Sequence, residues 1–492
     1  MQIGEILVAA GAVTAEEVEE ALRRQRSAGG LLGDNLVALG LITQQRLEAI
    51  LREMPPPPRS LAETGIAEAE LLNLMLKLMY ARSIDTPSKI AEGLMLPARL
   101  VGILITDAEK RQLVESMGML EGAYLSEVRY ALSQAGRRKA LEALEANQYI
   151  GPAPVSLTDY HARILRQRIT NERIGRDQVE AAFADLTIPG DFMDRLGPAI
   201  NSGRALLLYG PAGNGKTSIA ERIGGIFGDI VYVPYCIEID GQYIKVFDPD
   251  LHEPASVQPK PDRIEAIRRQ DLDRRWVPCK RPIVITGGEL SLEMLDLQWN
   301  AQARFYEAPL HMKAIGGTFI IDDFGRQLIS PERLLNRWIV PMQSRFDYLK
   351  LHTGKSFSIP FDELLIFSTN MAPQDLMDPA FLRRIPYKLE TPAPSLGVYR
   401  DIFVSVAESA GLPFDEDIFD HIVDRLTNTE NQHLACYQPR FIVDQVVAAC
   451  KYEGVPPSLS PARVAVAIDN LYVRAKPAAP GHHTPFTLAR AG

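Results

Sequence analysis

The chain has few cysteines, no long hydrophobic run and no excess of basic residues. Its 492 residues include four cysteines, scattered without a CxxC pair, and this spacing argues against a zinc site and against a disulfide framework. No run approaches the ~18 apolar residues of a membrane-spanning helix, and the N-terminus lacks the basic-then-apolar pattern of a signal peptide. We therefore expect a protein of the reducing cytoplasm, without a membrane span.

The charge balance is acidic. With 53 basic and 62 acidic side chains the net charge is −9, so the chain lacks the global positive field that holds nucleic acid. Any contact with DNA would have to be local. Hydrophobic residues make up 46% and charged residues 23% of the chain, which is typical of globular protein, and the length predicts roughly three or four domains.

The first fifty residues contain an internal repeat. The pattern IGxxLxxxGxVT that begins at Ile3 recurs as LGxxLxxxGxIT beginning at Leu32. In each copy a threonine, Thr14 or Thr43, caps an expected helix, which predicts two helix-turn-helix units. Consecutive prolines at 55–58 then form a stiff break that we interpret as a domain boundary.

The segment after the prolines has the pattern of three helices followed by a pair of short strands, which is winged-helix architecture. Apolar spacing over 68–82 is helical, Pro87 and Pro97 start two more helices, and 127–132 alternates as a strand. The third helix, expected over 97–116, mixes basic with acidic residues, as a solvated face usually does. A protein-interaction role and DNA binding both stay open for this domain.

A phosphate-binding motif follows at residues 210–217. A short apolar strand runs into the sequence GPAGNGKT, and a helix follows. In this context glycines let backbone N–H groups point at phosphate oxygens, at the positive end of the helix. Lys216 supplies a charge to the β and γ phosphates and Thr217 a hydroxyl to Mg²⁺, so ATP and Mg²⁺ are the predicted cofactors. The predicted nucleotide-binding residues are Gly210, Pro211, Ala212, Gly213, Asn214, Gly215, Lys216, Thr217 and Ser218.

Two aspartates end a second apolar strand. Residues 318–321 read Thr-Phe-Ile-Ile and are expected to form this strand, and Asp322 and Asp323 follow them directly. In P-loop folds a strand beside the phosphate loop delivers one acid to the Mg²⁺ shell, and a neighbouring acid polarises the attacking water. Asp322 fits the first role and Asp323 the second. A third apolar strand, 364–369, ends at Asn370.

These features resemble the AAA+ ATPases over about residues 174–473. Phosphate loop, paired acids, a strand that ends in asparagine and a later arginine pair occur in the same order and at similar spacing. By this resemblance Asn370 is a sensor that orients water. Arg383 or Arg384 is an arginine finger that reaches the γ-phosphate of the neighbouring subunit. Arg440 is similar to the sensor arginine of the helical lid.

The resemblance implies a homo-oligomeric ring, which we expect to be a hexamer that binds and hydrolyses ATP to remodel or regulate a protein partner. The family usually has glutamate where this chain has Asp323. Because aspartate is one methylene shorter, a slow ATP-binding switch is a second interpretation. A DNA-associated regulatory ATPase that uses the winged helix is a third.

The N-terminal repeat resembles the MshEN domains of secretion and pilus ATPases, some of which bind cyclic di-GMP. Members that bind this dinucleotide carry arginine before the Leu-Gly pair, where the side chain can lie over a guanine. This chain has Gln2 and Leu31 at those places, so protein docking and cyclic di-GMP sensing both stay open. The glycines of the two copies, which we expect to lie in loops, are Gly4, Gly11, Gly33 and Gly40.

The sequence thus predicts an α/β P-loop core of the AAA+ type with a C-terminal helical lid, preceded by an all-α MshEN-like domain and a winged-helix domain. No other catalytic or metal-binding set of residues rises above background. The expected segments are the repeat at 1–54, a proline-rich linker at 55–66, the winged helix at 67–155, a helical connector at 156–183, the α/β domain at 184–391, the lid at 392–474 and a disordered tail at 475–492.

Overall fold

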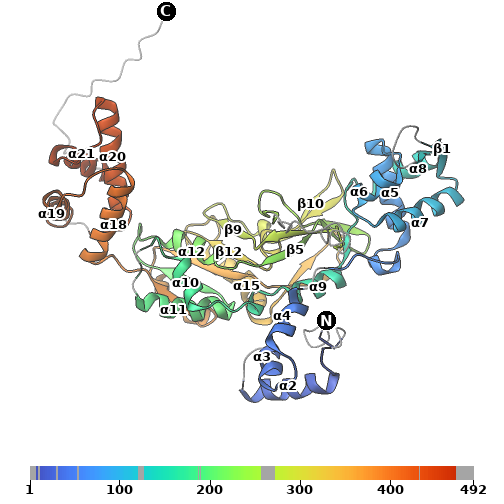
Figure 1. Cartoon of the computed structure of the whole chain (residues 1–492), viewed down its shortest axis with the longest axis horizontal. Coiled ribbons are helices and arrows are strands. Elements are labelled where there is room, and N and C mark those ends of the chain that lie inside the picture. The colour runs from blue at the N-terminus through green and yellow to red at the C-terminus, as the bar shows by residue number, and fades with distance from the viewer. Residues whose placement is uncertain are drawn as a thin grey trace, which may run out of the picture. The chain divides into compact units, whose positions relative to one another are not determined.

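The computed structural model of the chain divides into two compact units (Figure 1). One unit comprises residues 1–209 and 217–389, and the other comprises 210–216 together with 390–492. The tail expected to be disordered, 475–492, lies outside the described residues. The structure describes residues 7–8, 12–28, 32–52, 55–119, 127–186, 188, 190–255, 272–430 and 433–472.

The N-terminal repeat is helical, as predicted. It contains α2 (Ala15–Ala28), α3 (Leu32–Ala38) and α4 (Gln44–Arg52). Thr14, the predicted cap, forms a capping box at the start of α2: the Thr14 N–H donates to Glu17 Oε2 at 2.6 Å, and the Glu17 N–H donates to Thr14 Oγ1 at 3.3 Å. These two bonds satisfy donors that a helix start otherwise leaves without partners.

Equivalent apolar positions of the two repeat copies share one core. Leu7 and Leu36 are both buried, as are Val13 and Ile42, and Leu165 of a later helix belongs to the same cluster. The sequence repeat therefore corresponds to a repeat of buried positions.

The glycines of the repeat differ in their roles. Gly40 lies in a turn with a φ of 72°, a conformation that favours glycine. The expected loop position of Gly33 is wrong, because this residue lies in α3. A Cβ atom on Gly33 would lie 3.0 Å from Leu47 Cδ2, so close helix packing is the physical reason for this glycine. Gly4 and Gly11 lie outside the described residues.

Residues 55–154, which we call the winged-helix module, contain the predicted three helices and strand pair. The third helix is shorter than the expected range of 97–116. It ends at Lys110, because Gln112 takes a left-handed φ of 56° and Val114 already belongs to a strand. The elements are α5 (Glu68–Arg82), α6 (Pro87–Leu94), α7 (Ala98–Lys110), β1 (Val114–Met119), β2 (Val128–Leu132), which pairs antiparallel with β1, and α8 (Gln134–Ala146).

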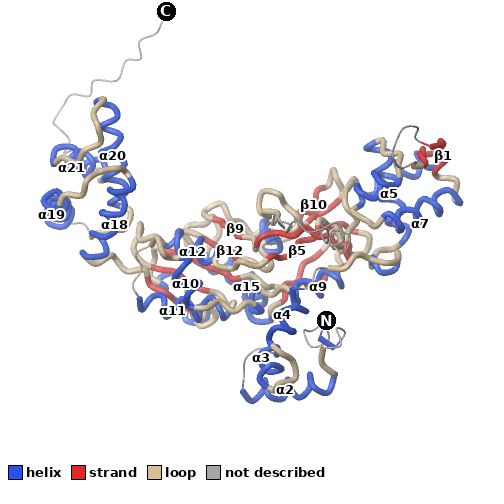
Figure 2. Tube along the Cα trace, in the orientation of Figure 1, coloured by secondary structure: helices blue, strands red, loops and turns tan. Residues whose placement is uncertain are grey.

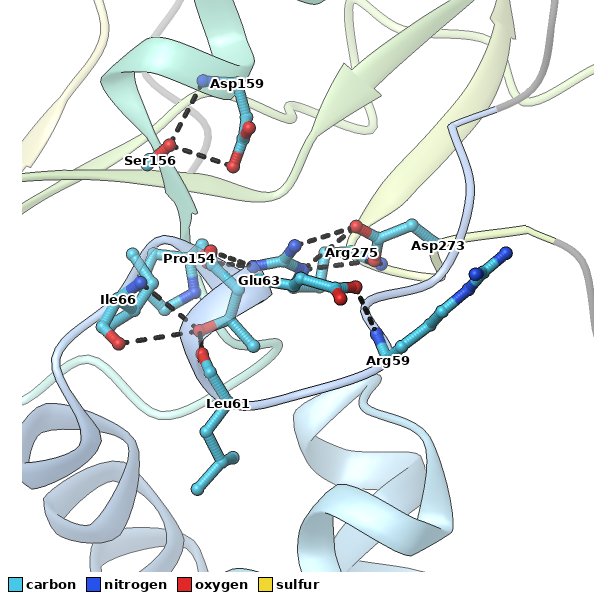
Figure 3. A network of polar contacts seen from close by, with 10 residues as sticks. Arg59, Leu61, Glu63, Ile66, Pro154, Ser156, Asp159, Asp273 and Arg275 are labelled. Carbon is cyan, nitrogen blue, oxygen red and sulfur yellow. Dashed lines mark hydrogen bonds and ion pairs between the residues drawn. The ribbon is translucent and has the colours of Figure 1, made fainter.

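A buried arginine joins the winged-helix module to the α/β part of the same unit (Figure 3). Arg275 is 2% exposed, and its guanidinium pairs with Asp273 at 2.8 Å. The same guanidinium donates to the carbonyl oxygens of Thr64 at 2.9 Å and Pro154 at 3.0 Å. The Asp273 N–H donates to the Pro55 carbonyl at 2.8 Å, so the proline run is held at its first residue. We call this set of contacts the Arg275 clamp.

A five-stranded sheet lies next to the clamp, in the order β10-β11-β7-β6-β3. A hairpin is formed by β6 and β7, which pair antiparallel across a two-residue turn. Asp240 and Gly241 in this turn have φ values of 51° and 73°, as such a tight hairpin turn requires. The strands are β3 (Val155–Ser156), β6 (Cys236–Ile239), β7 (Gln242–Lys245), β10 (Gln298–Asn300) and β11 (Phe305–Glu307).

A second five-stranded sheet has the order β16-β4-β15-β12-β9. Figure 2 shows the strands of the chain in red, with β9 and β12 of this sheet labelled. Neighbours from β4 to β9 run parallel, so the carboxyl ends of these strands meet at one edge. The two apolar strands predicted at 318–321 and 364–369 are confirmed. The strands are β4 (Leu206–Tyr209), β9 (Ile283–Thr286), β12 (Thr318–Ile321), β15 (Leu364–Thr369) and β16 (Tyr387–Glu390).

Helices cover both faces of the parallel sheet. Leu206 and Leu208 pack in one core with three helices, whereas Leu207 packs in another core with a fourth helix. Alternate residues of a strand point to opposite faces, so this arrangement gives three layers. The three helices are α10 (Arg176–Ala182), α11 (Gly190–Ser202) and α12 (Lys216–Gly225), and the fourth is α15 (Pro331–Ser344).

The C-terminal unit is helical, as predicted, and has its own apolar core. Its helices are α18 (Leu396–Ser409), α19 (Glu416–Asp424), the π-helical turn η4 (Arg425–Thr429), α20 (Gln438–Glu453) and α21 (Pro461–Leu471). The remaining elements of the first unit are η1 (Ala62–Thr64), α9 (Leu157–Arg166), η2 (Ile169–Asn171), β5 (Ile230–Pro234), β8 (Trp276–Lys280), η3 (Glu293–Leu295), α14 (Leu310–Lys313), β13 (Phe346–Lys350), β14 (Ser356–Pro360), α16 (Pro373–Leu376) and α17 (Pro379–Leu382).

Candidate functional site

The phosphate loop connects β4 to α12. Gly213 and Gly215 have φ values of 78° and 75°, which let the backbone turn its N–H groups inward without side-chain strain. Lys216 is 6% exposed, and its Nζ donates to the carbonyl oxygens of Gly210 at 2.9 Å and Pro211 at 2.8 Å. The loop therefore combines backbone donors with one buried ammonium, which are the groups that bind phosphate.

The phosphate loop also contacts the start of α20 within the C-terminal unit. The Tyr437 N–H donates to the Gly213 carbonyl at 3.0 Å, and the Cys436 N–H donates to Asn214 Oδ1 at 3.3 Å. A Cβ atom on Gly213 would lie 2.2 Å from Tyr437 Cδ1, so the tyrosine ring packs directly against this glycine. Sequence reasoning missed Tyr437, because nothing in the local pattern indicates which residue of a distant helix meets the loop.

Thr217 and Asp322 are joined directly in the α/β unit. Thr217 Oγ1 donates to Asp322 Oδ2 at 2.7 Å, and the Asp322 N–H donates to the Thr286 carbonyl at 2.8 Å. Mg²⁺ prefers oxygen ligands and usually takes only one or two carboxylates besides phosphates and water. A half-buried carboxylate beside a hydroxyl fits this preference, so the two residues could hold Mg²⁺.

Asp323 and Asn370 also meet at the carboxyl edge of the parallel sheet. Asp323 follows β12, Asn370 follows β15, and Asn370 Nδ2 donates to Asp323 Oδ1 at 2.9 Å. Asp323 is exposed and has a φ of 48°, which is uncommon for a residue with a side chain. The two residues predicted to handle water therefore lie in contact.

Gln327 is a third polar side chain at this edge, and the sequence analysis did not identify it. Its Nε2 donates to the carbonyl oxygens of Asp322 at 3.0 Å and Asp323 at 3.3 Å. A glutamine five residues after a strand has no sequence signature, because its partners are backbone atoms of the turn.

The three predicted arginines have different surroundings. Arg383 is exposed and directly follows α17, and its Nε donates to the carbonyl of Pro379 at the start of that helix. Arg384 is half-buried, and its guanidinium lies 5.8 Å from the ring centroid of Phe381. The Arg440 side chain is 78% exposed and faces an acid one turn later in α20 at 3.9 Å. Their finger and sensor roles stay predictions.

These elements define a mixed α/β protein in which a phosphate loop follows one strand of a parallel sheet. The phosphate loop follows β4, an aspartate of the site follows β12, an asparagine follows β15, and all three strands belong to one parallel sheet. None of the helices within the described ranges is long and apolar enough to cross a membrane.

Comparisons with known proteins give distant similarities. NtrX from Brucella abortus matches with 14% identity and a TM-score of 0.35, and this chain spans only 60% of that protein, with 61% of its own length matched. The RuvB Holliday junction branch migration motor of Thermotoga maritima matches with 14% identity and a TM-score of 0.32 over 61% of this chain and 70% of that chain. Domain III of the Thermotoga maritima replication initiation protein DnaA matches with 14% identity and a TM-score of 0.32 over 61% of this chain and 98% of that chain.

Sequence comparisons reach only the C-terminal helices. A family model described as a domain of unknown function (DUF8689) matches residues 395–470. No curated protein sequence matches the chain at a significant level.

Proposed function

We propose that this protein is an AAA+ ATPase that binds ATP with Mg²⁺, hydrolyses it within a homo-oligomeric ring and thereby remodels or regulates a protein partner. The observation that carries the proposal is the pairing of side chains at one sheet edge. Thr217 contacts Asp322, and Asn370 contacts Asp323. A hydroxyl, two carboxylates and an amide, in a chain that also carries a phosphate-loop motif, are the groups that phosphoryl transfer to water requires.

Each residue has a role that follows from its chemistry. Lys216 and the N–H groups of its loop bind the β and γ phosphates, and Thr217 with Asp322 would hold Mg²⁺, which neutralises phosphate charge when it is bound. Asp323 accepts a hydrogen bond from the attacking water and draws its proton away, while Asn370 holds the carboxylate in place. Because aspartate is short, we expect slow turnover.

The N-terminal parts are proposed as docking modules for the partner. α7 carries mixed charge, and Arg111, which directly follows it, pairs with Asp107 at 3.0 Å instead of presenting a free cation. A helix that reads DNA needs an excess of basic and amide side chains. Gln2 and Leu31, which stand where cyclic di-GMP binders have arginine, lie outside the described residues. Titrations with duplex DNA and with cyclic di-GMP test the two alternatives, and we expect no binding of either.

The proposal is tested by substituting the phosphate-loop cation. Lys216→Ala should weaken Mg·ATP binding at least tenfold, because the β and γ phosphates lose their ammonium partner. Calorimetric titration measures the affinity, and phosphate release measures turnover. Lys451→Ala, which removes an exposed lysine from α20, is the matched control and should change neither value. ATP affinity that survives Lys216→Ala, or a wild-type protein that binds no ATP, would contradict the site.

A further inference from the structure

The turn after β12 holds Asp323 in a strained backbone conformation. Its φ of 48° lies in the left-handed region, where the Cβ atom of an L-residue crowds the following carbonyl oxygen. Such strain persists only where surrounding contacts fix the backbone, and it concentrates at functional sites. Hydrogen bonds from four residues fix this turn: Phe324, Arg326, Gln327 and Thr369.

Two contacts tie the middle of the turn to the neighbouring strand. The Phe324 N–H donates to the Ser368 carbonyl at 2.7 Å, and Thr369 Oγ1 donates to the Phe324 carbonyl at 2.8 Å. Phe324 is 1% exposed, so it anchors the turn in the core. These bonds fix Phe324 but leave the carbonyl oxygens of Asp322 and Asp323 to other donors.

Gln327 supplies the missing donors. One amide group bridges the Asp322 and Asp323 carbonyl oxygens, at 3.0 and 3.3 Å from Nε2. Its Oε1 accepts the N–H of Gly325 at 2.8 Å. The half-buried side chain of Gln327 thus bonds backbone atoms before and after the strained residue. The Arg326 N–H is a second donor to the Asp323 carbonyl, at 3.0 Å.

The geometry requires an amide at this position. The two carbonyl oxygens need a donor and the Gly325 N–H needs an acceptor, so the orientation of the Gln327 amide follows from its partners. A carboxylate could accept from Gly325 but would place negative charge against the two carbonyl oxygens. Glutamate at 327 should therefore break the bridge although its shape is nearly the same.

We propose that Gln327 is a positioning residue for ATP hydrolysis, which acts by holding the backbone of Asp323 so that the carboxylate stays against Asn370 and faces the attacking water. Gln327 touches only backbone atoms of the turn in the described contacts, so it acts through Asp323. The inference rests on the proposed ATPase function and adds to it the side chain, Gln327, that orients Asp323.

The test compares turnover with ATP affinity in the full-length chain. Gln327→Ala and Gln327→Glu should each lower kcat about 10- to 100-fold, within the range of general-base contributions, and leave the Kd for Mg·ATP within a factor of two. Gln302→Ala, in an exposed turn, removes the same side chain elsewhere and should change neither value. A wild-type kcat in the Gln327 variants would overturn the proposal, whether or not their ATP binding is weakened.

A double-mutant cycle separates positioning from general loosening of the site. In an Asp323→Asn background, Gln327→Ala should lower the residual single-turnover rate by less than a factor of two, because the carboxylate it positions is gone. A further tenfold loss in that background means that Gln327 acts elsewhere. If Gln327→Ala does not fold, Gln327→Glu takes its place in the cycle, since it keeps the side-chain volume.

A structural arm distinguishes this inference from the proposed function. A crystal structure of Gln327→Ala should show Asp323 outside the left-handed region and its carboxylate away from Asn370. Wild-type protein without ATP turnover would refute the ATPase proposal, whereas an unchanged Asp323 in the variant crystal would refute the positioning role whether or not the protein hydrolyses ATP.

Discussion

At the scale of single residues, Lys77 shows how burial changes the chemistry of one charged group. The residue is 3% exposed, its Nζ donates to the Asn147 carbonyl at 2.9 Å, and it lies 5.5 Å from the ring centroid of Tyr243. Burial lowers the pKa of this ammonium to about 8, although Glu70 opposes the shift. The winged-helix module therefore carries a lysine that is charged at neutral pH and loses its proton in mildly alkaline solution.

This pKa predicts a pH dependence of stability. An unfolded lysine titrates near ~10.4, so between about pH 8 and 10 the unfolded chain binds a proton that the folded chain has released, and folding becomes more favourable as pH rises. In Lys77→Met this dependence is absent. The thermal unfolding midpoint of the full-length wild type should rise relative to that of Lys77→Met between pH 7.5 and 10. Lys89→Met, at an exposed site in the next helix, is the control, and a constant difference between wild type and Lys77→Met would contradict the prediction.

Residue chemistry was predictable where it follows a motif. Thr217 and Asp322 could be placed together because a phosphate loop and an acid after an apolar strand have fixed roles in a parallel sheet. Gln327 and Tyr437 could not, since both use contacts with backbone atoms that any residue provides. A role that depends on the type of a side chain can be predicted from the sequence, whereas a role that depends on which backbone atoms lie nearby cannot.

At the scale of elements, the contact between the phosphate loop and the start of α20 gives a second prediction. Gly213→Ala should weaken Mg·ATP binding, because a Cβ would meet the Tyr437 ring at 2.2 Å and the φ of 78° disfavours a side chain. Gly215→Ala should weaken binding less, because nothing lies within 4 Å of its Cβ and only its positive φ disfavours a side chain. The measurement is the Kd for Mg·ATP by calorimetry.

The matched rescue is Tyr437→Ala. Removing the ring should restore part of the affinity lost in Gly213→Ala and none of that lost in Gly215→Ala. Equal rescue of both variants, or of neither, would mean that the ring does not limit the loop at Gly213.

Secondary-structure elements were predictable where local chemistry decided them. β12 and β15 are buried along their whole length, as their continuous apolar residues require, and Asp240-Gly241 set the hairpin. The end of α7 and the position of β3 beside β6 were not predicted, because each depends on pairing with strands distant in the sequence. Non-local pairing is the information that one sequence does not display.

At the scale of the whole molecule, the proposed ring predicts that the proposed arginine finger acts across subunits. Arg383 is the better candidate, because it is exposed whereas the Arg384 guanidinium packs on Phe381. Arg383→Ala should keep ATP binding and reduce turnover steeply, by a factor of up to about 10³ or more as in known fingers. Arg384→Ala should reduce turnover less. ATP affinity and phosphate release of the purified variants measure both.

Mixing provides the control for this prediction. Subunits with Arg383→Ala retain the phosphate loop, and subunits with Lys216→Ala retain the finger, so a mixed ring contains intact junctions that neither variant forms alone. Turnover should reappear on mixing and increase with protein concentration. A demonstrably mixed ring without recovery would assign Arg383 to a role within its own subunit.

The Arg275 clamp has a mechanical consequence. One guanidinium holds two carbonyl oxygens of the winged-helix module, and the Asp273 N–H holds a third at its first proline. A force on the module would therefore pass through these hydrogen bonds to the segment just before β8. This attachment depends on one buried side chain, because the Arg275 guanidinium makes two of the three bonds.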